Sequence, residues 1–142
     1  MNANRFFLDT AYVLALLNPK YPYNKQAKVF LPTISDAREV WVTEAVLVEV
    51  GNALARSNHS AAIDFIDGCY NTPNIKVVSV DPALVHHAIE LYQSREDKEW
   101  GLTDCILFIV MQDRGLWEAL TTDEHFQQAG FRAMLREDMQ NY

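Results

Sequence analysis

The sequence predicts an α/β fold, in which a parallel sheet of four to five strands is flanked by helices. Short apolar runs alternate with longer amphipathic stretches along the whole chain, as they do in successive βα units. No internal repeat, low-complexity tract or glycine-rich linker interrupts this alternation. The length of 142 residues corresponds to one ordinary domain, so residues 1–142 are expected to fold together.

The expected strands are the short apolar runs. Residues 6–8 are continuously apolar, and residues 75–80 are rich in β-branched side chains, which strands favour. Residues 131–135 would form a last strand at an edge of the sheet. In chain order, the expected strands are 6–8, 39–42, 75–80, a run ending at 120–122, and 131–135.

The expected helices begin and end at recognisable residues. The first ends at Asn18-Pro19, because proline disfavours the helical conformation in the residue before it. Thr43 is placed to cap one helix, and Asp81 caps another whose first residue is Pro82. Gly115 ends the most apolar helix. The expected helices are 10–17, 23–37 with a break near Pro32, 44–55, 60–70 capped from Ser60 or near it, 82–94, 102–114, and 124–129 followed by Gly130.

Charge and composition limit the classes of function. The net charge of -7 argues against a general nucleic-acid coat protein, because Lys and Arg supply most of the affinity for phosphates. The sign fits a chain that concentrates acids at a cation site, or one that binds a basic protein partner.

The start of the chain lacks the pattern of a signal peptide, and the longest apolar run, 105–111, is too short to cross a bilayer. Cys69 and Cys105 have no metal-ligand spacing and are expected to be reduced core residues. We therefore expect a cytoplasmic protein that does not associate with membranes.

Four acidic residues fall where an α/β sheet places its ligands, outside the carboxyl ends of strands. Asp9 and Asp123 directly follow expected strands, and Asp104 lies in the first turn of a helix. Each of these also suits an ordinary role as a helix cap or a first-turn acid. Glu49 lies on an apolar helical stripe, where a carboxylate is costly unless it is paired or binds a metal.

One cause would explain all four positions, namely a divalent cation that holds the carboxylates together. Hard cations such as Mg²⁺ and Mn²⁺ prefer carboxylate and water oxygens, and the sequence has no cluster of His or Cys that favours zinc. His125 follows Asp123 by two residues and lies within reach of such a site, but packing is the role expected for it.

These residues resemble the motifs of the PIN-domain family, especially the VapC-type toxins of bacterial toxin–antitoxin pairs. Residues 7–10, Phe-Leu-Asp-Thr, resemble the opening strand, and Thr43 with Glu49 and residues 52–54 resembles the second motif. Residues 97–106 are similar to the third motif. Residues 120–126 with 129–131 are similar to the fourth, so the resemblance spans nearly the whole chain.

The resemblance implies a Rossmann-like sandwich, a homodimer and a Mg²⁺- or Mn²⁺-dependent endoribonuclease, a hydrolase of phosphodiester bonds. It also implies a small antitoxin partner that places a helix in an apolar groove and a basic side chain in the acidic pocket. The catalytic and metal-binding positions carry over to Asp9, Glu49, Asp104 and Asp123, with Asp9 and Asp104 as the core of the site. Asp97 matches an additional acid, with a solvated surface charge as its alternative. Thr10 and Thr122 match hydroxyls that support the acids, with ordinary capping as the alternative.

Other classes fit the sequence less well. A haloacid-dehalogenase-type phosphotransferase needs a second Asp two residues after the first, where Ala11 stands. A receiver domain needs an early acidic pair and a lysine after a late strand, but Asp9 has no acidic neighbour and no lysine follows Asp123. A flap-nuclease-like enzyme has a longer chain with more acids. A PIN-fold RNA-binding or scaffold protein without catalytic activity remains the main alternative.

Overall fold

A computed structural model describes the backbone of residues 4–140 and the side chains up to residue 137. Five strands form one parallel sheet in the order β3-β2-β1-β4-β5, which confirms the predicted fold class. The strands are β1 Arg5–Leu8, β2 Glu39–Thr43, β3 Ile75–Val78, β4 Glu118–Leu120 and β5 Arg132–Ala133. The helices are α1 Thr10–Leu17, α2 Asn24–Val29, α3 Leu31–Asp36, α4 Glu44–Ala53, α5 His59–Asn71, α6 Pro82–Ser94, α7 Leu102–Arg114, α8 Glu124–Gln128 and α9 Met134–Gln140.

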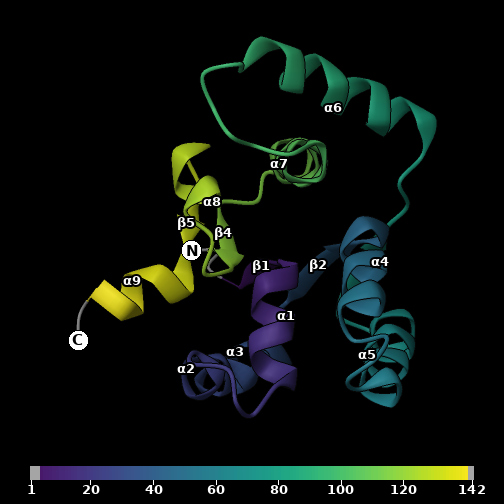
Figure 1. The fold of residues 1–142 in the computed structure, drawn as a ribbon, viewed down its shortest axis with the longest axis vertical. Helices are drawn as coiled ribbons and strands as arrows, with labels where there is room; N and C mark the ends of the chain where they lie inside the picture. Colours follow the sequence, from purple (N-terminus) through teal and green to yellow (C-terminus); the bar gives the residue numbers. More distant parts are fainter. Residues whose placement is uncertain (1–3, 141–142) are drawn as a thin grey trace.

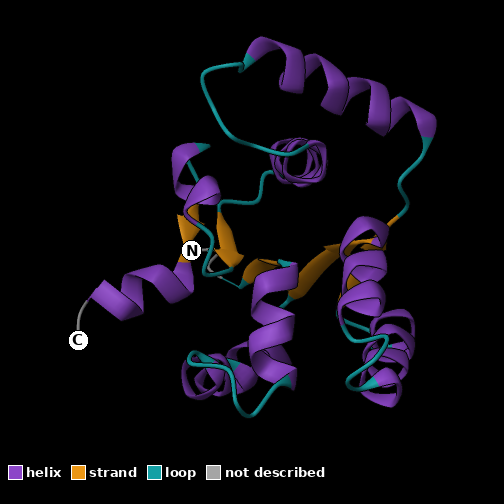
Figure 2. Cartoon of the chain, in the orientation of Figure 1, coloured by secondary structure: helices purple, strands orange, loops and turns teal. Residues whose placement is uncertain are grey.

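The direction of the strand order decides which face each helix covers. The chain runs from β1 to β2 and β3 in one direction along the sheet, and then from β4 to β5 in the other. Right-handed crossovers therefore place α1, α4 and α5 on one face and α7, with α6 outside it, on the opposite face (Figure 1). The order reverses between the neighbouring strands β1 and β4, and the ends of these two strands mark the place where α/β sheets bind ligands (Figure 2).

Helix α7 is the most deeply buried helix segment among the described residues. All seven residues from Cys105 to Met111 are buried, because the sheet covers one side of the helix and α6 packs against another. Gly115 ends the helix with a φ of 65°, a conformation that glycine adopts without steric cost. Cys69 and Cys105 are both buried and unpaired, as predicted.

Two helical segments show the predicted break and the predicted start in detail. The stretch 23–37 divides into α2 and α3 at Phe30, because Pro32 lies in the first turn of α3, where its missing N–H would have no helical partner in any case. Helix α5 is capped near Ser60, as predicted, by Asn58, since the side-chain oxygen of Asn58 accepts a hydrogen bond from the Ala61 N–H.

Three strands are shorter than predicted. Strand β4 ends at Leu120, so the prediction that it includes Thr121 and Thr122 and that Asp123 follows it directly is wrong. Strand β3 ends at Val78, because the Val80 N–H donates to the carboxylate of Glu44 in α4 and not to a neighbouring strand. The expected edge strand 131–135 is wrong in extent, since only Arg132–Ala133 pairs with β4. The chain then turns into α9, which buries Leu135 completely and directs its N–H to the carbonyl of Thr121. Among the described residues, no helix combines the length and apolar character that a membrane span requires.

The cap of α4 gives a testable contribution to stability. Thr43 is fully buried and its Oγ1 accepts a hydrogen bond of 3.2 Å from the Val46 N–H. Thr43→Ala is expected to lower the free energy of unfolding by about 1 kcal/mol, measured by urea denaturation, because this donor loses its partner. Thr43→Ser retains the hydroxyl and should recover most of the loss, whereas equal losses in the two variants would contradict a role for the cap.

Candidate metal centre

Asp9 lies at the point where the strand order reverses. It follows β1 directly, and its backbone N–H donates to the carbonyl of Leu120 at the end of β4. Asp9 is only 6% exposed, and its side chain makes no well-formed capping hydrogen bond to α1, although the nearby N–H groups of Thr10 and Ala11 lower its pKa to a small extent. Instead, its Oδ2 accepts a hydrogen bond of 2.7 Å from the hydroxyl of Thr121.

The surroundings of Asp9 disfavour its charged form. Burial raises the pKa of Asp9 from its ordinary value of 3.8 to about 7 and outweighs the hydrogen bond from Thr121, which lowers the pKa. The negative charge of Asp123 raises the pKa further. A carboxylate in such a place is stabilised by a nearby cation, which reverses the effect of both burial and like charge.

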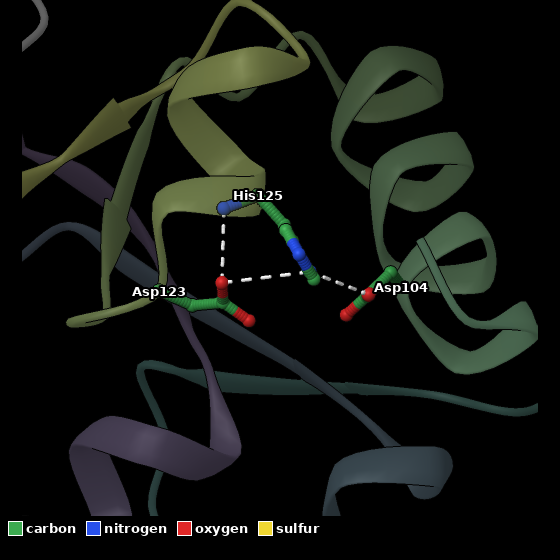
Figure 3. A group of neighbouring side chains, drawn as sticks. All are labelled: Asp104, Asp123 and His125. Carbon is green, nitrogen blue, oxygen red and sulfur yellow. Dashed lines mark hydrogen bonds and ion pairs between the residues drawn. The ribbon is translucent and has the colours of Figure 1, made fainter. Parts of the chain in front are cut away.

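Asp104, Asp123 and His125 gather at the same end of the sheet (Figure 3). Asp104 lies in the first turn of α7, Asp123 precedes α8, and His125 lies in the first turn of α8. Nδ1 of His125 lies 3.1 Å from Oδ2 of Asp104 and 3.6 Å from Oδ1 of Asp123. One ligand atom from each of the three side chains lies within 4.8 Å of the others, a spacing that suits a single metal ion.

Thr121 connects Asp9 to this group. Its hydroxyl donates to Asp9 and accepts a hydrogen bond of 2.9 Å from the backbone N–H of Asp123. The sequence prediction assigned the supporting hydroxyl to Thr122, but the residue that contacts Asp9 is its neighbour. Thr122 instead offers its carbonyl to the guanidinium of Arg136. The pair Thr121-Thr122 was visible in the sequence, but the pattern does not decide which of the two hydroxyls faces Asp9.

Glu49 is held near Asp9 by the residue that follows Asp9 in the chain. Oε1 of Glu49 accepts a hydrogen bond of 2.6 Å from the hydroxyl of Thr10. Glu49 and Thr103, the residue before Asp104, line the same groove of about 880 Å³. Glu49 is thus linked to the residue next to Asp9 and shares a groove with the residue next to Asp104, but it is not one of the three side chains that share a possible ion site.

Asp97 is not a member of this group either. Its side chain is exposed and makes two hydrogen bonds of 2.9 Å to the guanidinium of Arg95. The hydrogen bonds from Arg95 lower the pKa of Asp97 to about 2. The surface ion pair accounts for Asp97 without any metal.

His125 is the residue of this site whose position sequence reasoning missed. Its ring lies between two of the predicted acids instead of packing in the core, and its side chain is 24% exposed. Its backbone N–H also donates to Oδ1 of Asp123 at 2.9 Å. The spacing of two residues after Asp123 was the available signal, because a first-turn side chain can turn back toward the residue that caps its helix.

The fold is a doubly wound parallel sheet, and its carboxylates gather where the strand order reverses. These two features define a class of α/β proteins suited to binding a divalent cation. The PIN domain model matches residues 6–132, and the chain belongs to the PIN-domain family. This match confirms the resemblance that the motifs indicated.

Three solved structures are similar to this fold. VapC20 of Mycobacterium tuberculosis, described as a toxin that cleaves the sarcin–ricin loop, is 26% identical with a TM-score of 0.81, over 91% of this chain and 98% of that chain. FitAcB of Neisseria gonorrhoeae is 14% identical with a TM-score of 0.62, over 90% and 97% of the two chains.

VapBC2 of Rickettsia felis, bound to a fragment of promoter DNA, is 12% identical with a TM-score of 0.64, over 88% and 92% of the two chains. The last two similarities concern the fold alone. No curated protein sequence matches the chain closely enough to count as a relative.

Proposed function

We propose that this protein is a metal-dependent endoribonuclease and the toxin of a VapBC-type toxin–antitoxin pair. The observation that carries the proposal is the gathering of Asp104, Asp123 and His125 beside the buried Asp9, at the point of the sheet where ligands bind. Membership of the PIN family and the similarity to VapC20 support it. The proposed site of action is RNA in the cytoplasm.

The proposed metal ligands are Asp9, Asp104, Asp123 and Glu49, which offer the hard oxygen atoms that Mg²⁺ and Mn²⁺ accept. A divalent ion bound there supplies an activated water and neutralises charge on the phosphate. The chain's own residues orient the ligands: Thr121 holds Asp9, and Thr10 holds Glu49. The burial of Asp9 excludes bulk water from one side of the site and strengthens its attraction for a cation.

RNA is the substrate class that the similarity to VapC20 favours, since that protein is described as a toxin that cleaves an RNA loop. The chain's net charge of -7 makes broad electrostatic attraction to nucleic acid weak. We therefore expect recognition to depend on the shape of a structured RNA and on phosphates held at the metal site.

The partner that we propose is a small antitoxin protein, together with a second copy of the chain in a homodimer. The similar structures include VapBC2 bound to a fragment of promoter DNA, and VapC20, which is described as a toxin. The groove beside the site is lined by apolar residues, including Leu47, Val48 and Ile66. The acidic side chains of Glu44 and Glu49 also line it. An amphipathic helix with a basic side chain directed at these acids has the complementary chemistry.

Metal-dependent cleavage is the test of the proposed activity. Purified protein incubated with an end-labelled hairpin RNA should produce discrete fragments with 5′-phosphate and 3′-hydroxyl ends when Mg²⁺ or Mn²⁺ is present. EDTA should abolish the products, and an excess of Mn²⁺ should restore them. Calorimetric binding of metal without cleavage of any structured RNA would favour the inactive RNA-binding or scaffold alternative.

A further inference from the structure

The ring of His125 occupies the place of a third metal ligand. An octahedral ion with bonds of about 2.1 Å places adjacent ligand atoms about 3 Å apart and opposite ones about 4.2 Å apart. Nδ1 of His125 lies 3.1 Å from Oδ2 of Asp104 and 3.6 Å from Oδ1 of Asp123, within this interval. The ring belongs to a helix different from that of Asp104, so two elements bring these atoms together.

Neither carboxylate depends on the ring for its orientation. Oδ2 of Asp104 accepts a hydrogen bond of 3.1 Å from the backbone N–H of Gly101. Oδ1 of Asp123 accepts one of 2.9 Å from the backbone N–H of His125 itself. Because both acids already have backbone donors, the imidazole is not required to hold them in place. A neutral ring with its proton on Nε2 directs the lone pair of Nδ1 between the two carboxylates.

We propose that His125 is a direct nitrogen ligand of the metal centre, and that it makes the centre prefer a first-row transition ion over Mg²⁺. This inference rests on the proposed function, because it concerns the same centre. Imidazole nitrogen suits transition ions, whereas Mg²⁺ favours oxygen ligands and retains several waters. A centre that adds one imidazole to its carboxylates therefore discriminates between ions that a purely carboxylate site would bind more alike.

Pulsed electron paramagnetic resonance with Mn²⁺ tests the proposal independently of catalysis. One equivalent of Mn²⁺ bound to the full chain should show electron spin-echo modulation from a directly coordinated ¹⁴N. Uniform ¹⁵N labelling should change this modulation, and His125→Gln should remove it. His86 provides the matched control, because it is an exposed histidine whose Nδ1 contacts the carbonyl of Pro82 in α6. His86→Gln should keep the modulation.

Titration calorimetry gives a second measurement. His125→Gln should weaken Mn²⁺ binding by more than about 100-fold, which exceeds the usual cost of losing a residue that only supports a ligand, and should change Mg²⁺ binding much less, so the ratio of the two affinities falls. If wild-type protein binds Mn²⁺ without nitrogen modulation, the inference is wrong while the carboxylate centre of the proposed function stands. If wild-type protein binds no Mn²⁺, the proposed metal centre itself is wrong. The wild-type spectrum decides between these results even if His125→Gln does not fold.

Discussion

Asp104→Asn is expected to lower the rate of metal-dependent RNA cleavage by more than about 100-fold. Asp104 contributes one of the three ligand atoms that lie within 4.8 Å of one another, and asparagine removes its negative charge with little change of shape. Loss of a residue that only supports a metal ligand typically costs about 10-fold to 100-fold in metal affinity or activity, so loss of a ligand costs more. Single-turnover cleavage at saturating Mn²⁺ measures the chemical step.

A matched control lies on the same helix. Asp113 is exposed near the end of α7 that is far from Asp104, so Asp113→Asn removes the same charge from the same element without touching the centre. Its cleavage rate should stay within about 2-fold of wild type, because exposed charges contribute little at a distance. Equal losses in the two variants would mean that Asp104 acts through overall charge, which would exclude it as a ligand.

The fold was predictable because the helix boundaries depend on local chemistry. Helix α7 has the predicted bounds, since its apolar run needs burial and Gly115 supplies the left-handed residue at its end. Thr43 and Asp81 cap α4 and α6 as predicted. The side-chain oxygen of each accepts a hydrogen bond from the backbone N–H three residues later in the chain. The last strand was not predictable, because tertiary packing of Leu135 against the sheet turns residues 134–140 into a helix.

The acids of the candidate site were predictable for a different reason. Asp9 follows β1 directly and Asp123 comes three residues after the last residue of β4, and the carboxyl ends of neighbouring parallel strands meet at one edge of the sheet. The roles of Thr121 and His125 depend on which way a side chain turns after its strand or helix begins. That direction is set by contacts with Asp9 and Asp104, which are far away in the sequence, so the local pattern does not contain it.

Metal-free protein is expected to lose stability as the pH rises from about 4 to about 7, because of Asp9. The pKa of Asp9 is 3.8 in its ordinary surroundings and about 7 in the fold, so the folded state binds its proton more tightly than the unfolded state does. The stabilising effect of that proton is complete below about pH 4 and is lost as the pH rises toward 7. A difference of about 3 pKa units corresponds to about 4 kcal/mol.

Asp9→Asn isolates this contribution, since the amide oxygen can still accept the hydrogen bond from Thr121 but carries no charge. In EDTA, the variant should match wild type near pH 4 and exceed its free energy of unfolding by up to about 4 kcal/mol at pH 8, measured by urea denaturation. Mn²⁺ should then stabilise wild type at pH 8 far more than it stabilises the variant, because the variant lacks the buried carboxylate that gains most from a counter-ion. A variant that is less stable than wild type at both pH values would show that the Asp9 charge is compensated within the protein alone. The ionised side chain of Asp9, a proposed metal ligand, is thus expected to destabilise the metal-free fold, because burial disfavours its charge and the nearby charge of Asp123 adds to this effect.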